Sequence, residues 1–461
     1  MLEGLKKVHF IGIGGYGMSA LAFILLQAGI DVRGSDIQRS GITAQLEKAG
    51  AKVYLGHNPE QLGDAQLAVY STAIRPDNSE MEAAREKGLL LWHRSELLGA
   101  ILNAGYGIAV AGTHGKTTTT AMISLILARG GCDPTAVIGG EVPFFQGNAR
   151  LGKSPYIVAE ACESDHSFLR YQPRLAVVTN IEADHLEHYN GSFEQLVETY
   201  RHFINNASAK GQVILCSDDP ILQDLRPGLA PPLMSYGLRP GADIRGGEVQ
   251  LQGLGASFQV YSKEKHLGGI TLKVPGRYNV ANALGAVSVA LHLGIDFTTI
   301  QEALARFDGV KRRFEIVGER EGVLVVDDYA HHPTEIKAAL EAARQSGRRL
   351  VCIFQPHRYT RTSFLWDDFV LAFDEADILL LTGIYSAGEK PLFRITAPRL
   401  AREIQKRGHK DVHFLEDKEQ IIEFLEKNTQ SGDLVLTLGA GDVWQIGRGF
   451  LENVPSRPVY P

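Results

Sequence analysis

Strand-like and helix-like patterns alternate along the N-terminal part of the chain. Residues 8–11 and 31–35 have the pattern of short strands, and the spacing of apolar positions over 18–28 and 42–49 predicts helices. The alternation continues through 67–71 and ends around 92–98. This βαβα order is typical of a parallel sheet that is covered by helices.

A second region of the same kind opens near residue 106. Its predicted strands are 108–111, 156–159, 175–179 and 213–216, and its predicted helices are 116–129 and 193–206. From 234 to 274 the pattern changes to short strands punctuated by glycine, which indicates an antiparallel insertion before a helix at 278–293.

A third alternating region begins after Arg313. Its predicted strands are 323–326, 350–354, 378–381 and 434–438. The pattern as a whole predicts an α/β protein with three domains, at residues 1–98, 99–313 and 314–461.

Composition agrees with several folded domains. The 461 residues are 44% apolar and 22% charged, with a formal net charge of −6. The N-terminus is a poor signal peptide, and no apolar run is long enough to cross a bilayer. We therefore predict a cytoplasmic protein that binds neither nucleic acid nor membrane, and the sequence leaves monomer and homodimer open.

The strongest chemical signal is a glycine loop between a predicted strand and a predicted helix. Its backbone N–H groups and the helix dipole would face a phosphate, with Lys116 supplying charge and Thr117 reaching Mg²⁺. Val110 stands where the full phosphate-loop pattern has its first glycine, so the loop is a short variant, and an ordinary glycine turn is the alternative. The residues predicted to bind ATP here are Gly112, Thr113, His114, Gly115, Lys116, Thr117 and Thr118.

Acidic residues and a histidine follow two neighbouring predicted strands. Glu160 comes directly after 156–159, at the end where parallel strands place ligands, and is the predicted partner of Thr117 on Mg²⁺. Glu163 and Asp165 are close in sequence. The alternative is that these acids are solvated loop residues, an interpretation that the pattern favours for Glu163 more than for Glu160. His185, which follows 175–179, is either a second metal ligand or a structural histidine.

The first domain carries a second glycine loop. Residues 12–17, GIGGYG, fit the pattern of a dinucleotide-binding turn, and Asp36 ends the next predicted strand. A nucleotide-sugar diphosphate would satisfy the same loop, because the glycines only let a pyrophosphate approach a helix N-terminus. An NAD-dependent oxidoreductase remains an alternative, although hydride transfer gains nothing from an ATP loop in the next domain.

Seven motifs in order resemble those of the Mur ligase family over nearly the whole chain. The glycine loop with Met18 and Ser19, together with the paired histidines, favours the member that adds the first amino acid. The motifs are residues 9–19 (HFIGIGGYGMS), 112–118 (GTHGKTT), 180–185 (NIEADH), 276–283 (GRYNVANA), 312–315 (RRFE), 327–333 (DDYAHHP) and 355–362 (QPHRYTRT).

The resemblance implies an ATP-dependent ligase of peptidoglycan synthesis. It would join L-alanine to the lactyl carboxylate of UDP-N-acetylmuramate through an acyl phosphate, with Mg²⁺. The implied domains are a Rossmann-like domain for the UDP-sugar, a central phosphate-loop ATPase domain with a small antiparallel portion, and a Rossmann-like domain for the amino acid. A nucleotide-gated binding protein without catalysis and a ligase for another amino acid or a recycled peptide are the other readings.

The resemblance also implies roles for single residues. Asn279 and Asn282 would contact ATP, Arg313 the transferring phosphate, and His185 a second metal ion. Asp328 would be catalytic, with His331 or His332 beside it, and Arg358 and Arg361 would face the alanine carboxylate. The predicted UDP-sugar residues are Gly14, Gly15, Gly17, Met18, Ser35 and Asp36.

Two positions depart from the family pattern. Cys162 stands where an aspartate is common, and His166 where a small residue is usual, which weakens any role for Glu163 and Asp165. Without the resemblance, Arg358 and Arg361 read as a basic helix start, and the histidine pair as a turn before Pro333.

Overall fold

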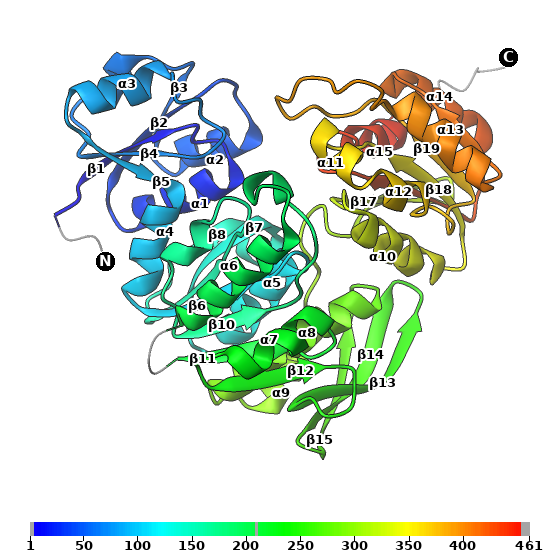
Figure 1. Cartoon of the computed structure of the whole chain (residues 1–461), viewed down its shortest axis with the longest axis horizontal. Coiled ribbons are helices and arrows are strands. Elements are labelled where there is room, and N and C mark those ends of the chain that lie inside the picture. The colour runs from blue at the N-terminus through cyan, green and yellow to red at the C-terminus, as the bar shows by residue number, and fades with distance from the viewer. Residues whose placement is uncertain (1–3, 208–210, 453–461) are drawn as a thin grey trace, which may run out of the picture. The chain divides into compact units, whose positions relative to one another are not determined.

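A computed structural model describes residues 4–207 and 211–452 of the chain. These residues form three sheets with helices, shown from blue to red along the chain in Figure 1. They group into two compact units: unit 1 contains residues 1–247, 259–270 and 281–307, and unit 2 contains 248–258, 271–280 and 308–461. The first sheet and the phosphate loop belong to unit 1, and the third sheet belongs to unit 2.

The first sheet is parallel and has the order β3-β2-β1-β4-β5. The order reverses at β1, and the crevice at such a switch point is where open α/β sheets bind ligands. The strands are β1 (Lys7–Ile11), β2 (Asp31–Asp36), β3 (Lys52–Leu55), β4 (Leu67–Tyr70) and β5 (Leu90–His93). The helices are α1 (Tyr16–Gln27), α2 (Gly41–Lys48), η1 (Pro59–Leu62), α3 (Ser79–Glu86) and α4 (Arg94–Asn103).

The second sheet has ten strands in the order β15-β14-β13-β12-β11-β10-β6-β9-β7-β8. Its central strand β6 (Tyr106–Ala111) is parallel to both neighbours, and residues 108–111 are fully buried, as a continuous apolar run requires. The other strands are β7 (Thr135–Val142), β8 (Gly147–Arg150), β9 (Tyr156–Glu160), β10 (Leu175–Val178), β11 (Gln212–Cys216), β12 (Leu233–Gly237), β13 (Ile244–Gln252), β14 (Gly255–Ser262) and β15 (Lys265–Leu272).

Helices pack along this second region at the predicted places. The predicted helices 116–129, 193–206 and 278–293 are α5 (Lys116–Arg129), α6 (Phe193–Asn205) and α8 (Arg277–His292). The others are α7 (Pro220–Leu225) and α9 (Phe297–Ala305), with short 3₁₀ turns η2 (Pro143–Phe145), η3 (Ser167–Arg170), η4 (Leu186–His188) and η5 (Arg226–Gly228).

Two sets of strands in this region, β13 to β15 and the β7–β8 hairpin, differ in how well the sequence predicts them. The predicted antiparallel insertion at 234–274 covers β12 to β15. It is wrong for β12, which is parallel to both β11 and β13. The connections of two residues between β13, β14 and β15 join only antiparallel neighbours, as predicted. The antiparallel pair β7 and β8 was not predicted. Its strand β7 also pairs parallel to β9, so it extends the sheet beside Glu160.

The third sheet has the order β16-β17-β21-β18-β19-β20, with only the edge strand β16 antiparallel. Alternate residues of its strands face two apolar clusters: Val326 and Leu436 pack with α10, and Val325 and Val435 with α15. The strands are β16 (Glu315–Arg320), β17 (Val323–Asp328), β18 (Arg349–Phe354), β19 (Ile378–Leu381), β20 (Val412–Phe414) and β21 (Asp433–Leu438). The helices are α10 (Pro333–Arg344), α11 (Tyr359–Phe364), α12 (Trp366–Val370), α13 (Ala397–Arg407), α14 (Lys418–Asn428) and α15 (Trp444–Glu452).

The α/β class with three sheet-containing regions is confirmed. The exact domain limits stay predictions, and the limit near residue 98 falls inside α4. None of the helices in the described part of the chain has the length and apolar character needed to cross a membrane.

Candidate active site

The loop between β6 and α5 needs glycine at both ends. Gly112 has φ +134° and Gly115 has φ +82°, a region that other residues rarely adopt. A Cβ on Gly112 would overlap the Thr179 hydroxyl, and a Cβ on Gly115 would overlap the amide of Asn282. The loop therefore lies closely against both residues and directs the N-terminus of α5 outward from the sheet edge.

Lys116 begins α5, and its ammonium group is held by three acceptors. It donates to the carbonyls of Gly112 and Thr113, the latter at 3.0 Å, and to Glu163 Oε1 at 3.0 Å. Burial alone would lower the pKa of Lys116, but the adjacent Glu163 charge outweighs burial and raises it, so the side chain is charged. A phosphate that binds to this ammonium would compete with Glu163.

A hydroxyl and a carboxylate lie beside the loop where a metal ion is predicted. Thr117 Oγ1 donates to Glu160 Oε2 at 3.1 Å, and the backbone N–H of Gly139 on β7 donates to Glu160 Oε1. Hard oxygen donors of this kind suit Mg²⁺, which commonly takes one or two protein ligands and completes its shell with water and phosphate. The residues present therefore fit the ion.

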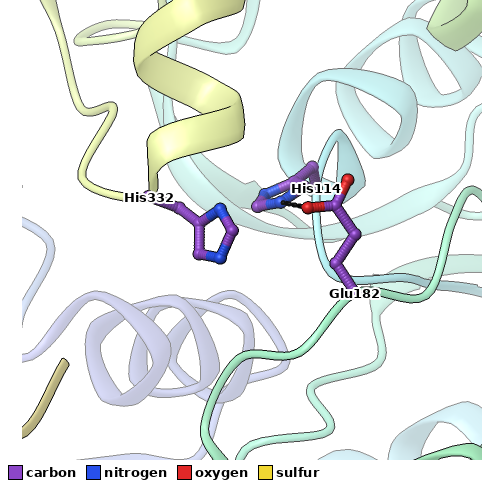
Figure 2. A group of neighbouring side chains, drawn as sticks. All are labelled: His114, Glu182 and His332. Carbon is purple, nitrogen blue, oxygen red and sulfur yellow. Dashed lines mark ion pairs between the residues drawn. The ribbon is translucent and has the colours of Figure 1, made fainter. Parts of the chain in front are cut away.

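The segment after β10 forms the back of the loop. Asn180 accepts from the His114 N–H at 2.8 Å, and Thr179 donates to the His114 carbonyl at 2.6 Å. Figure 2 shows the His114 ring beside the carboxylate of Glu182, with Nε2 at 3.4 Å from Oε2. His185 lies further along in a left-handed conformation, φ +55°, with Asp184 at 3.6 Å. Its predicted role as a metal ligand stays a prediction.

The two predicted ATP-contacting asparagines fall in different units. Asn282 on α8 belongs to unit 1, where it accepts from Thr119 Oγ1 at 3.3 Å and lies against Gly115. Asn279 belongs to unit 2, where its amide donates to the Pro275 carbonyl at 2.7 Å. Asn282 is therefore adjacent to the phosphate loop within unit 1.

The glycine loop of the first sheet is tied to β2. The N–H groups of Gly12 and Ile13 both donate to the Ser35 carbonyl, at 2.8 and 2.9 Å, and Gly14 donates to Asp36 Oδ2 at 2.8 Å. Gly15 caps α1 and Gly17 lies in its first turn. The side chains of Ser35 and Met18 are buried, with exposures of 0% and 2%.

Two contacts join this glycine loop to the central region within unit 1. Asn148 on β8 donates to the Tyr16 carbonyl at 2.8 Å, next to Gly17. The second contact involves Arg94, whose guanidinium lies so close to Gly17 that an added Cβ there would be 3.3 Å away. The same guanidinium interacts with Cys162 and Asp165 of the central region. Sequence reasoning missed Gly139, Asn148 and Arg94, because each acts through a partner that is distant in the sequence.

In unit 2, Asp328 is the last residue of β17, and its side chain is buried. Its two oxygens accept from the N–H groups of Phe314 and Ala330, each at 2.7 Å. Burial raises the pKa of Asp328 to about 7, although Arg313 and the N–H donors oppose the shift. A carboxyl group with such a pKa can exchange a proton near neutrality.

The histidine pair forms the turn from β17 to α10. His332 caps α10, with Nδ1 accepting from the Thr334 N–H at 3.3 Å, and Glu335 completes a capping box. His331 Nδ1 lies 2.9 Å from the Tyr329 carbonyl and 3.3 Å from Glu335. Glu335 also lies 3.7 Å from Arg313, whose guanidinium stacks over Tyr329.

Arg358 and Arg361 follow β18 at the same carboxyl edge of the third sheet as Asp328. Arg358 has φ +67° and precedes α11, and its N–H donates to the Tyr385 carbonyl at 2.8 Å. Arg361 is 7% exposed and lies 3.3 Å from His357 Nδ1. The ring of His357 lies 5.9 Å from that of His331, so His357 contacts both the predicted Arg361 and the predicted His331 at this edge.

This combination of fold and loop defines a class: the α/β proteins that bind a nucleoside triphosphate through a phosphate loop. Family models assign the chain more narrowly. The "Mur ligase family, catalytic domain" matches residues 7–106, the "Mur ligase middle domain" matches 110–290, and the "Mur ligase, glutamate ligase domain" matches 312–441. The chain belongs to the Mur ligase family.

Individual relatives match the chain from end to end. A UDP-N-acetylmuramate--L-alanine ligase of Geobacter sp. (strain M21) is 48% identical, with 98% of each chain covered. The solved structure of a UDP-N-acetylmuramate-alanine ligase from Thermotoga maritima has a TM-score of 0.84 and 30% identity, covering 97% of this chain and 98% of that one. A murein peptide ligase from Psychrobacter arcticus has a TM-score of 0.73 and 26% identity, with coverages of 97% and 98%.

Proposed function

We propose that the protein joins L-alanine to the lactyl carboxylate of UDP-N-acetylmuramate, with conversion of ATP to ADP and phosphate, in peptidoglycan synthesis. The observation that carries this proposal is the end-to-end similarity to relatives of that name, at 48% identity over 98% of the chain. The phosphate loop, with Lys116 charged at its end, supports the use of ATP. We place the UDP-sugar at residues 1–98, ATP at 99–313 and the amino acid at 314–461, and the enzyme in the cytoplasm, where ATP is supplied.

The first half of the proposed reaction activates the carboxylate. A carboxylate does not react with an amine directly, because its oxygen is a poor leaving group. One carboxylate oxygen attacks the γ-phosphorus in line, the bond to the β-γ bridging oxygen breaks, and an acyl phosphate and ADP result. Lys116 and Arg313 spread the charge that develops on the phosphoryl oxygens.

Magnesium would be held by Thr117 Oγ1 and the carboxylate of Glu160, which are paired at 3.1 Å. Bound there, the ion neutralises phosphate charge. His185 is proposed as a ligand for a second ion. Asn279 and Asn282 are proposed to hold the nucleotide.

The second half forms the amide. The alanine ammonium loses a proton to the base, and the neutral amine attacks the acyl carbon. The nitrogen of the tetrahedral adduct then loses a second proton as the bond between the acyl carbon and the phosphate oxygen breaks, which releases phosphate and leaves the neutral amide. Asp328, whose pKa of about 7 suits a proton acceptor near neutral pH, is the proposed base, with His331 or His332 beside it in the turn to α10. Arg358 and Arg361 are proposed to bind the alanine carboxylate through paired hydrogen bonds.

The nearest competing function is a ligase that attaches a recycled peptide, which the structural likeness to a murein peptide ligase favours. Phosphate release from ATP and UDP-N-acetylmuramate should be measured with L-alanine, glycine, L-serine and an L-alanyl peptide in parallel. The proposal requires L-alanine to give the highest kcat/KM and a UDP-linked alanyl product. Preference for the peptide would establish the competitor, and nicotinamide binding without ATP turnover would establish an oxidoreductase.

A further inference from the structure

Three fully buried polar side chains and one largely buried histidine meet next to the glycine loop of the first sheet. His9 on β1, Ser35 on β2 and Glu80 on α3 are each 0% exposed. His57, between β3 and η1, has a side-chain exposure of 16%. Buried polar groups of this kind are costly unless each one is hydrogen-bonded.

The side chains of His9, Ser35 and His57 all contact the carboxylate of Glu80. Oε1 lies 3.1 Å from His9 Nε2, and Oε2 accepts from Ser35 Oγ at 2.5 Å and lies 3.0 Å from His57 Nδ1. With its amide nitrogen turned toward the carboxylate, Gln61 donates a further hydrogen bond to Oε1 at 2.9 Å. We name these residues, 9, 35, 57, 61 and 80, the Glu80 cluster.

The position of Glu80 favours its charged form. It lies in the first turn of α3, where Asn78 caps the helix and accepts from the Glu80 N–H at 3.0 Å, so the positive end of the helix dipole is beside it. Burial alone would raise its pKa, but the hydrogen bonds from His9 and Ser35 outweigh burial and lower it. The cluster thus contains an ionised carboxylate in the interior of a domain.

Ser35 connects the Glu80 cluster directly to the glycine loop that is proposed to bind the substrate diphosphate. The carbonyl of Ser35 accepts from both Gly12 and Ile13, while its hydroxyl is bound by Glu80. His9 lies on β1 just before the loop, so the same carboxylate holds β1 and β2 where they support it. A shift of Ser35 would therefore shift two of the N–H groups that define the loop.

Stability alone does not account for such a cluster, because replacing a buried ionic network by apolar residues is often neutral or stabilising. We propose that Glu80 is a positioning residue for UDP-N-acetylmuramate binding, acting through Ser35 on the glycine loop. It contacts no substrate itself. This inference rests on the proposed function and assigns that function a residue outside its seven motifs.

The test uses two substitutions of different severity in the full-length enzyme. Glu80→Gln keeps the volume but removes the charge, and Ser35→Ala removes only the hydroxyl. Hydrogen bonds to a charged group are stronger than neutral ones by an amount that corresponds to about tenfold in affinity. We expect Glu80→Gln to raise KM for UDP-N-acetylmuramate about tenfold, with KM for ATP and kcat at saturation within about twofold, and Ser35→Ala to act in the same direction.

Ser288→Ala is the matched control. Ser288 is also 0% exposed, and its hydroxyl donates to the Leu284 carbonyl at 2.8 Å within α8, so the variant loses a buried hydroxyl elsewhere in unit 1. Its KM for the UDP-sugar should stay at the wild-type value. Calorimetric binding of UDP-N-acetylmuramate and of an ATP analogue, with thermal unfolding, accompanies each variant.

Lower thermal stability with unchanged UDP-sugar affinity in both Glu80→Gln and Ser35→Ala would overturn the inference and leave the cluster a purely structural role. Equal losses for ATP and the UDP-sugar would overturn it as well. Absence of UDP-N-acetylmuramate binding by the wild-type enzyme would instead refute the proposed function. If Glu80→Gln does not fold, Glu80→Asp decides, because it keeps the charge but shortens the side chain that reaches Ser35.

Discussion

At the scale of single residues, Lys116 is the clearest case of a side chain prepared for an anion. Its charge is retained in a buried position because Glu163 and two loop carbonyls surround it. Lys116→Ala removes the charge that stabilises the transferring phosphate, and we expect alanine-dependent phosphate release to fall at least about 100-fold. The exposed Lys153 is the control, since Lys153→Ala should have wild-type activity. Normal turnover by Lys116→Ala would refute the mechanism.

Glu160 is predicted to respond to magnesium concentration. Glu160→Gln keeps the size of the side chain but removes the charge that would bind the ion beside Thr117. The Mg²⁺ concentration for half-maximal phosphate release should rise about tenfold or more, which a titration at saturating ATP measures. Glu198→Gln on α6, whose side chain is 53% exposed, should leave the titration unchanged. An unchanged curve for Glu160→Gln would place the metal elsewhere.

Asp328 should make the stability of unit 2 depend on pH. Its folded pKa of about 7 lies above its ordinary value of about 4, so the neutral form is favoured by folding. That stabilisation is complete below about pH 4 and is lost as the pH rises through about 7. Asp328→Asn mimics the neutral form at every pH.

The difference in stability between wild type and Asp328→Asn should therefore shift in favour of the variant by a few kcal/mol from pH 4 to pH 8. Unfolding in guanidinium at several pH values measures it. Parallel pH profiles for the two proteins would show that Asp328 ionises normally.

At the scale of elements, the β7–β8 hairpin supports Glu160. Gly139 on β7 donates its N–H to Glu160, and a Cβ at Gly139 would lie 2.7 Å from Glu160 Oε2. Gly139→Ala should therefore displace the carboxylate and raise the Mg²⁺ requirement in the same direction as Glu160→Gln. A Cβ at Gly147, in β8 of the same hairpin, would meet no neighbouring side chain within 4 Å, so Gly147→Ala should be neutral in the same titration. Equal effects of both substitutions would indicate a general loss of the hairpin.

The helices and strands around the site differ in how far they could be predicted. The α5 helix was predictable to the residue, because an apolar strand ends before a loop bounded by Gly112 and Gly115 and the helical pattern begins at Lys116. The β7–β8 hairpin was not, since its short strands gain their stability from pairing with β9 rather than from their own pattern.

At the scale of the whole molecule, the two glycine loops should bind their nucleotides independently. Each ligand at about 100 times its Kd stabilises the folded state by about 2.7 kcal/mol, which raises Tm by a few degrees. We expect Mg-ATP and UDP-N-acetylmuramate each to raise the Tm of the wild-type enzyme. Lys116→Ala should lose the shift with Mg-ATP and retain the shift with the UDP-sugar. Loss of both shifts would indicate that the two loops are coupled.

Local patterns in the sequence were enough to establish the α/β class, the three regions and the positions of the two glycine loops. Apolar periodicity, the spacing of glycines and a lysine at a predicted helix start are all features of neighbouring residues, so they can be read without a structure. The same patterns identified Glu160 as a chemical candidate, since it follows a predicted buried strand, whereas Asp328 became a candidate only through the resemblance to the Mur ligase family.

The side chains that act on those candidates became known only from the folded chain. The contacts from Glu163 to Lys116, from Gly139 to Glu160, and from Glu80 to Ser35 join residues that are 21 to 47 positions apart. The pKa of Asp328 likewise depends on burial by the folded unit. Strand order and packing fix such pairings, and no local pattern encodes them, so the loops were readable from the sequence while the groups that hold them were not.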